Sequence, residues 1–99
     1  MEWQVYIILC SDNSLYTGIT TDIERRFRQH GEGKGARYFR GRRPVRVVLL
    51  ERGHSRSSAA TREAKVKAFS RAAKMQLIEE VARQHAGSIP RKTWEISLP

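Results

Sequence analysis

An alternating apolar segment near the start of the chain restricts the fold more than any other feature. Residues 3–10, WQVYIILC, carry apolar side chains on both faces of an extended chain, which predicts a strand covered on both sides. The polar cluster SDNS at 11–14 predicts a turn, and residues 15–19 resume as a second strand. Together these segments predict a β-hairpin.

The hairpin also predicts where two tyrosines lie. Directly paired residues of an antiparallel hairpin have numbers with a constant sum, and this turn suits a sum of about 22 or 24. Either sum places Tyr6 and Tyr16 on the same face. Gly18 follows in the second strand, where a glycine indicates a twist or a close approach to the backbone.

A helix is predicted directly after the hairpin, from about residue 22 to residue 30. Thr21 as N-cap and Glu24 three positions later match the capping-box pattern. Arg26 and His30 lie four residues apart, at the border of the apolar stripe of this helix and near the hairpin. Both side chains are therefore candidates for a site beside the tyrosines.

Residues 31–44, GEGKGARYFRGRRP, have no regular period and predict a long basic loop, in which the glycines provide flexibility. Between residues 25 and 46, nine Lys and Arg residues accompany a single acid, a net charge of +8. The whole chain has a net charge of +9 and a pI near 10.6. So concentrated a charge indicates a polyanionic partner such as nucleic acid, although composition alone also fits a basic protein without one.

The second half of the chain predicts one strand and two helices. The apolar run at 45–51 predicts a third strand, and a turn is expected at 53–57. Residues 57–86 have helical apolar spacing with a break near 70–72. The expected order is thus strand, strand, helix, strand, helix, helix.

The length of 99 residues predicts one domain covering 1–99, with its core at about 3–86 and a tail at 87–99. In the tail, Trp94 and Ile96 are expected to form a short strand against the body. His54 and His85 have no partners by spacing and are expected on the surface.

Several classes of protein are excluded by what the sequence lacks. A single cysteine, Cys10, allows neither an internal disulfide framework nor a multi-cysteine zinc site, and we expect it to be a small buried side chain. The first ten residues lack the basic leader and cleavage site of a signal peptide. No apolar run approaches the ~18 residues of a membrane span. We therefore expect a cytoplasmic protein.

Five residues in order resemble the motifs of the GIY-YIG nuclease superfamily. The first strand has Val5-Tyr6, the second has Tyr16-Thr17-Gly18, and Arg26, His30 and Glu63 follow on predicted helices. The segments LYTGITTDIERR and GKGARYFRGRRP are similar to its small stand-alone bacterial branch, and the resemblance covers about residues 3–82. Gln4 replaces the glycine of the first motif, and Ile19 stands where some relatives have lysine.

The resemblance implies an α+β fold with a small three-stranded antiparallel sheet flanked by helices, in ββαβαα order. It also implies cleavage of phosphodiester bonds that depends on a divalent cation, Mg²⁺ or Mn²⁺, with Glu63 as the metal-binding carboxylate. Arg26 would stabilise negative charge on the phosphoryl oxygens in the transition state. Tyr6 would be the general base, with Tyr16 and His30 orienting water or phosphate.

The basic loop would then guide nucleic acid to the site, with DNA favoured over RNA. Its proposed phosphate contacts are Lys34, Arg37, Arg40, Arg42 and Arg43. Without an appended recognition domain, strandedness or branching should matter more than base sequence.

Other interpretations of the same residues remain open. Tyr6 and Tyr16 also suit simple packing in the sheet, and Glu63 with Lys67 forms an ordinary helical ion pair. The catalytic interpretation rests on three elements that each place a polar residue at the rim of an apolar face. The main alternative is a nucleic-acid-binding module that keeps the fold without cleaving, and a further one is a subunit that binds a protein partner.

Overall fold

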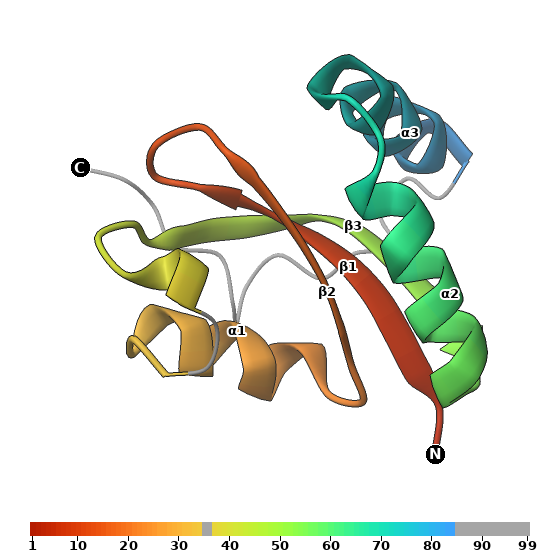
Figure 1. Cartoon of the computed structure of the whole chain (residues 1–99), viewed down its shortest axis with the longest axis horizontal. Coiled ribbons are helices and arrows are strands. Elements are labelled where there is room, and N and C mark those ends of the chain that lie inside the picture. The colour runs from red at the N-terminus through yellow and green to blue at the C-terminus, as the bar shows by residue number, and fades with distance from the viewer. Residues whose placement is uncertain (35–36, 85–99) are drawn as a thin grey trace.

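The protein, described by a computed structural model over residues 1–34 and 37–84, is an α+β fold built on one antiparallel sheet (Figure 1). The sheet has three strands in the order β2-β1-β3: β1 (Trp3–Cys10), β2 (Leu15–Thr20) and β3 (Pro44–His54). Three helices flank it: α1 (Ile23–Gly31), α2 (Arg56–Lys67) and α3 (Arg71–Gln84). The expected fold class and element order are confirmed.

The hairpin register places the tyrosines as predicted. Tyr6 pairs with Gly18 and Ile8 pairs with Tyr16, so paired residue numbers sum to 24. In the strand order β2-β1-β3, β2 is an edge strand, and Tyr6 lies on the central strand, β1.

The two faces of the sheet carry separate clusters of apolar side chains, as the first strand predicts. On one face, Tyr6, Ile8 and Cys10 pack with Phe27 of α1 and with Phe39. The prediction that Cys10 is buried is confirmed.

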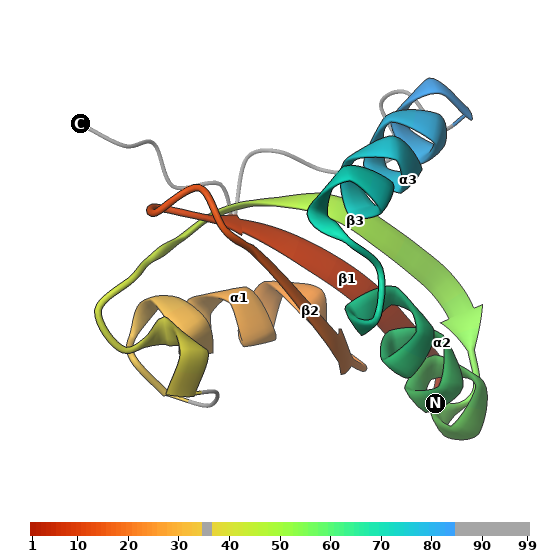
Figure 2. The same ribbon diagram turned by 45° about the horizontal axis from the view of Figure 1, so that its top comes forward.

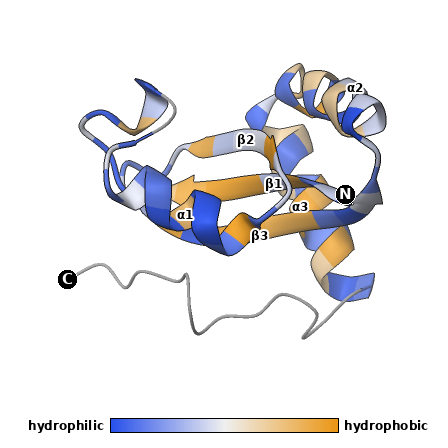
Figure 3. Ribbon diagram, turned by 90° about the horizontal axis from the view of Figure 1, so that it is seen from below, coloured by the Kyte–Doolittle hydropathy of each residue, from blue (hydrophilic) through white to orange (hydrophobic). Residues whose placement is uncertain are grey.

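On the opposite face, Ile7 and Leu49 pack with Val66 of α2, and partly buried residues of α3 join them. Figure 2 shows α1 on one side of the sheet and both α2 and α3 on the other. In Figure 3 the strands are mostly apolar, whereas hydrophilic residues dominate the visible surface of α1.

The cap of α1 differs from the prediction. Asp22, and not Thr21, is the N-cap, and its carboxylate accepts a hydrogen bond from the backbone N–H of Arg25 at 3.1 Å. Thr20 holds this turn, because its Oγ1 accepts from the backbone N–H of Asp22 at 3.1 Å. Aspartate satisfies the first-turn donors as threonine would and also adds a negative charge at the positive end of the helix.

The third strand is longer than the predicted 45–51. It continues to His54, which pairs with Trp3 across a shift in register, and Gly53 has a positive φ of 78° in this irregular segment. The turn predicted to begin at residue 53 therefore begins later, because a bulge lets the strand continue pairing past the glycine.

The predicted break in the second half of the chain is confirmed, at 68–70 between α2 and α3. Ser70 caps the start of α3, where its Oγ accepts from the backbone N–H of Ala73 at 3.1 Å. Among the described residues, no helix is both long and apolar enough to span a membrane. The predicted tail strand, with Trp94 and Ile96, lies outside the described residues, as does His85.

Candidate active site

Gly18 makes room for the first tyrosine of the candidate site. A Cβ atom at this position would lie 2.6 Å from Cζ of Tyr6, closer than any real contact. The Tyr6 ring therefore lies across the backbone of β2, and its hydroxyl reaches the edge strand. The close approach predicted at Gly18 is confirmed.

Tyr6 and His30 form a buried hydrogen-bonded pair. The Tyr6 hydroxyl lies 2.9 Å from Nε2 of His30, and each residue is only 1% exposed. The ring of Tyr16 meets that of His30 edge-on at 5.3 Å between centroids, and Phe39 stacks on the imidazole at 4.1 Å while also contacting the Tyr16 ring at 4.9 Å. These contacts hold the imidazole between β2 and the segment after α1.

Burial controls the protonation of this pair. Burial raises the pKa of Tyr6, and the nearby Tyr16 raises it further, whereas the Arg26 guanidinium opposes the rise. Burial, followed by the charge of Arg26, lowers the pKa of His30 from 6.5 to about 4. Near neutral pH, Tyr6 is therefore protonated and His30 is a neutral imidazole.

Arg26 and Glu63 reach the tyrosines from opposite sides of the sheet edge. Figure 1 shows β2 between α1, which carries Arg26, and α2, which carries Glu63. Both charges act on both tyrosines: Arg26 lowers the pKa of Tyr6 and of Tyr16, and Glu63 raises each. In Tyr16, burial is the main cause of a raised pKa. Of the five residues singled out from the sequence, Tyr6, Tyr16 and His30 are thus in contact, and Arg26 and Glu63 lie close enough for their charges to act on both tyrosines.

Glu63 is the residue best suited to hold a divalent cation. No cluster of three or more His, Cys, Asp or Glu side chains exists within residues 1–34 and 37–84, so this part of the chain builds no complete metal cage. Mg²⁺ commonly binds through one or two carboxylates and keeps several waters and substrate phosphate oxygens as its other ligands. A single carboxylate that is 22% exposed fits this mode.

A lysine also belongs to this group. Lys67 places its Nζ 3.3 Å from Oε2 of Glu63, and its charge lowers the pKa of Tyr16. The sequence showed the spacing of four residues but not the position beside Tyr16, because helical periodicity says nothing about the neighbouring strand.

The basic segment, which is the stretch at 31–44 predicted to be a basic loop, contacts the site through its aromatic residues. Arg37–Phe39 form a 3-10 helix, η1, in a region predicted to be an irregular loop. Phe39 is buried against His30, and Tyr38 lies 5.0 Å from Tyr16 between ring centroids. The guanidinium of Arg42 lies over the Tyr38 ring at 4.0 Å. An aromatic chain thus connects the catalytic candidates to the basic segment.

The hairpin turn also fixes the end of this segment. Arg42 forms an ion pair with Asp12 at 3.1 Å, and the backbone N–H of Arg43 donates to Oγ of Ser11 at 2.9 Å. The charge of Arg42 is partly offset by Asp12, whereas four of the proposed phosphate contacts have exposed side chains: Lys34, Arg37, Arg40 and Arg43.

His54 has partners, contrary to the prediction. Its Nε2 lies 3.2 Å from Oε1 of Glu51, and its Nδ1 lies 2.9 Å from Oγ of Ser58. Arg62 of α2 donates to both oxygens of Glu51, which secures α2 to β3. The spacing of residues in the sequence does not predict this network, because its central ion pair, between Glu51 and Arg62, joins β3 to α2.

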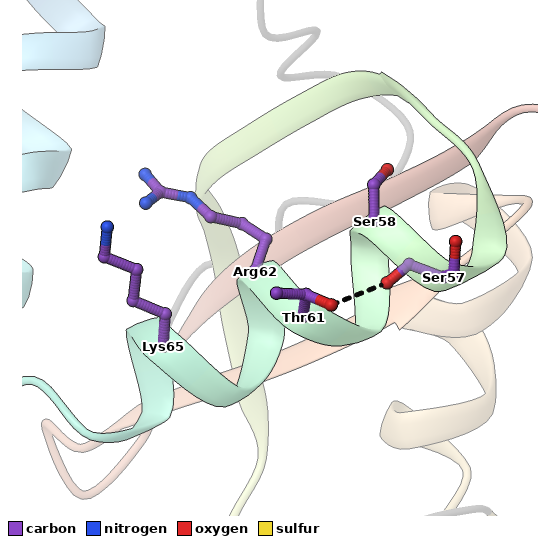
Figure 4. Close-up of a pocket in the computed structure, with 5 residues that line it drawn as sticks. All are labelled: Ser57, Ser58, Thr61, Arg62 and Lys65. Carbon is purple, nitrogen blue, oxygen red and sulfur yellow. Dashed lines mark hydrogen bonds between the residues drawn. The ribbon is translucent and has the colours of Figure 1, made fainter.

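Two of the hollows on the surface of the described structure bear on α2 and on the candidate site. A hollow of 380 Å³ on α2 is lined by Ser57, Ser58, Thr61, Arg62 and Lys65 (Figure 4). Because successive residues of a helix are rotated by about 100°, these residues lie on a different face of α2 from Glu63. A smaller hollow of 170 Å³ contains Arg26 together with Trp3 and Gln29. Only the smaller one borders the candidate site.

Comparison of the whole sequence with known proteins finds one family model and several relatives that it matches. The family model described as the GIY-YIG catalytic domain matches residues 2–76. A UPF0213 protein of Haloquadratum walsbyi is 55% identical over 77% of this chain and 85% of its own length. One of Staphylococcus haemolyticus is 53% identical over 77% of this chain and 93% of its own length.

Solved structures agree with these matches. The solution structure of a UPF0213 protein from Bacillus halodurans is 46% identical, with a TM-score of 0.53 over 81% of this chain and 85% of that one. A solution structure from E. faecalis is 36% identical, with a TM-score of 0.61 over 86% of this chain and 91% of that one.

Proposed function

This chain belongs to the GIY-YIG family, and on that premise we propose that it hydrolyses phosphodiester bonds of nucleic acid with the aid of a divalent cation. The GIY-YIG domain is a nuclease-type domain, and its nucleases generally use divalent metals. The observation that supports the proposal most directly is the hydrogen-bonded Tyr6–His30 pair beside Arg26 and Glu63. DNA, single-stranded or branched, is the proposed substrate.

Arg26 is proposed to bind the scissile phosphate. A guanidinium donates two parallel hydrogen bonds to phosphate oxygens, and a fixed positive charge stabilises the transition state as charge develops on them. Arg26 is half-buried, and its Nη1 donates to Oε1 of Gln29 at 3.2 Å. This bond orients the guanidinium before substrate arrives.

Glu63 is proposed to hold the divalent cation, Mg²⁺ or Mn²⁺. When bound, the cation would supply Lewis-acid stabilisation of the phosphoryl and leaving oxygens. The other residues of the site then have to position water and move its proton.

Tyr6 is proposed to take that proton, while its own phenolic proton passes to Nε2 of His30. The transfer is balanced, because the attacking water loses one proton and the imidazole gains one. In the free protein, burial and, after it, the charge of Arg26 lower the pKa of His30, which opposes this step. A phosphate bound to Arg26 offsets the second of these causes, so we expect the transfer to be easier in the substrate complex than in the free protein.

The test is cleavage of labelled single-stranded, duplex and branched DNA with Mg²⁺ or Mn²⁺. Arg26→Gln should slow cleavage by about 10²–10³-fold, as expected for loss of a charge-stabilising donor. Glu63→Gln should abolish the metal-dependent cleavage, and Glu80→Gln, at an exposed carboxylate of α3, serves as the matched control. Undiminished cleavage by Glu63→Gln would refute the proposed metal site.

A non-catalytic nucleic-acid-binding module is the second candidate. It is favoured by the burial of Tyr6 and His30 and by the ion pair that Glu63 already makes with Lys67. This alternative predicts salt-dependent binding without cleavage products under any metal.

A further inference from the structure

Lys67 neutralises the carboxylate that the proposed function assigns to the metal. Its Nζ lies 3.3 Å from Oε2 of Glu63, and the lysine side chain is 53% exposed whereas that of Glu63 is 22% exposed. Ion pairs that are this accessible to solvent are weak, so the ammonium is easily displaced. A divalent cation that binds Glu63 repels this ammonium, because both positive charges would lie against the same carboxylate.

The surroundings of Lys67 suggest where the displaced ammonium would go. Lys67 is the last residue of α2, and its charge acts on Tyr16 of the edge strand. Burial and, after it, the positive charge of Lys67 lower the pKa of Lys74 of α3, so the two ammonium groups are close enough to repel each other. Lys67 and Arg26 thus both carry positive charge close enough to act on Tyr16.

We propose that Lys67 is a phosphate-positioning residue that exchanges partners: it pairs with Glu63 in the free protein and, once a divalent cation displaces it, binds a phosphate oxygen of the nucleic acid beside Tyr16. The proposal rests on the function proposed above for Glu63. Lysine suits this exchange because its ammonium is a compact charge on a flexible stem. The exchange couples cation binding to substrate binding, since the cation frees a phosphate ligand.

The exchange predicts two effects of opposite sign. Lys67→Met removes the competitor for Glu63, so it should tighten the binding of Mn²⁺ to the free protein by about three- to tenfold. The same substitution removes a phosphate contact, so with Mn²⁺ present it should weaken binding of a phosphorothioate oligonucleotide, which resists hydrolysis, by about threefold or more. A purely structural helix pair would not move the two affinities in opposite directions.

Mn²⁺ binding is measured by titration calorimetry and oligonucleotide binding by fluorescence anisotropy. Lys65→Met, on a different face of α2, is the matched control and should leave Mn²⁺ binding unchanged. Lys67→Arg keeps the charge and should restore wild-type behaviour in both assays.

The outcomes separate this inference from the proposed function. If Glu63→Gln binds Mn²⁺ as tightly as the wild type, the proposed metal site is wrong and the inference falls with it. If Glu63→Gln loses Mn²⁺ binding but Lys67→Met does not tighten it, only the exchange by Lys67 is overturned.

Discussion

At the residue scale, Gly18 and Tyr6 depend on each other. The Tyr6 ring occupies the space that any side chain at residue 18 would need. Gly18→Ala should therefore force Tyr6 to move, lowering the free energy of unfolding by about 1–3 kcal/mol and displacing its hydroxyl from His30. Urea unfolding measures the first effect, and the DNA cleavage assay measures the second.

Gly41→Ala is a useful control for this prediction. A Cβ at Gly41 meets no atom within 4 Å, but the backbone has φ of 80°, so alanine should reduce stability through the backbone alone. Its specific activity should persist. Equal activity of Gly18→Ala and the wild type would show that the position of the Tyr6 hydroxyl is not needed.

His30 should make stability depend on pH. The unfolded chain protonates this imidazole below its ordinary pKa of 6.5, whereas the folded protein does so only near pH 4. The unfolded state therefore binds more protons in this window, so the contribution of His30 is complete above pH 6.5 and falls as the pH drops towards 4. The loss should be on the order of 3 kcal/mol.

The measurement is urea unfolding of the wild type and His30→Gln at several pH values between 4 and 7. The variant will be less stable overall, so the comparison is between slopes against pH and not between absolute stabilities. Identical slopes would contradict a buried neutral imidazole.

At the element scale, the hairpin and the basic segment show what a sequence can and cannot predict. The alternation of side chains along a strand and the constant sum of paired residue numbers in a hairpin suffice to place Tyr6 and Tyr16 on one face, because both depend on local periodicity. The anchoring of the basic segment depends on contacts between Asp12 and Arg42, thirty positions apart, which no local pattern encodes. The choice of Asp22 over Thr21 as N-cap was equally undetermined, since either side chain can cap a helix.

In the candidate site, too, some positions could be predicted from the sequence and others could not. Arg26 and His30 were identifiable from their spacing on one helix, and Glu63 from the family motif. The place of Lys67 beside Tyr16 depends on how α2 packs against β2, which only the structure gives.

The anchored basic segment should bind phosphate through its exposed arginines. Replacing Arg40 and Arg43 together with glutamine should reduce the slope of log affinity against log salt by about 1.4–1.8, because two phosphate contacts are lost. Filter binding or anisotropy across a salt series gives the slope. An unchanged slope would show that Arg40 and Arg43 do not contact the phosphates of the nucleic acid.

The control pair lies near the other end of the sheet. Arg52 and Arg56 have exposed side chains close to the end of β3, whereas the basic segment precedes the start of that strand. Their replacement by glutamine changes the net charge equally but should leave the salt slope nearly unchanged. A comparable fall in slope would indicate a diffuse effect of charge and not a track of phosphate contacts.

At the scale of the whole molecule, the site joins elements that are distant in the sequence. Tyr6 comes from β1 and Glu63 from α2, 57 positions later in the sequence, so unfolding separates them. A ligand that needs this arrangement binds the folded state only, and it must raise the free energy of unfolding. At a concentration of 100 times its Kd, Mn²⁺ should raise the stability of the wild type by about 2.7 kcal/mol.

Thermal or urea unfolding with and without Mn²⁺ tests this linkage without any cleavage assay. Glu63→Gln should lose the stabilisation, whereas Glu80→Gln should keep it, because Glu80 is exposed on α3 outside the proposed site. Stabilisation that survives in Glu63→Gln would mean that the cation binds elsewhere on the folded protein. Because this readout is independent of turnover, it would detect the metal site even if the protein bound nucleic acid without cleaving it.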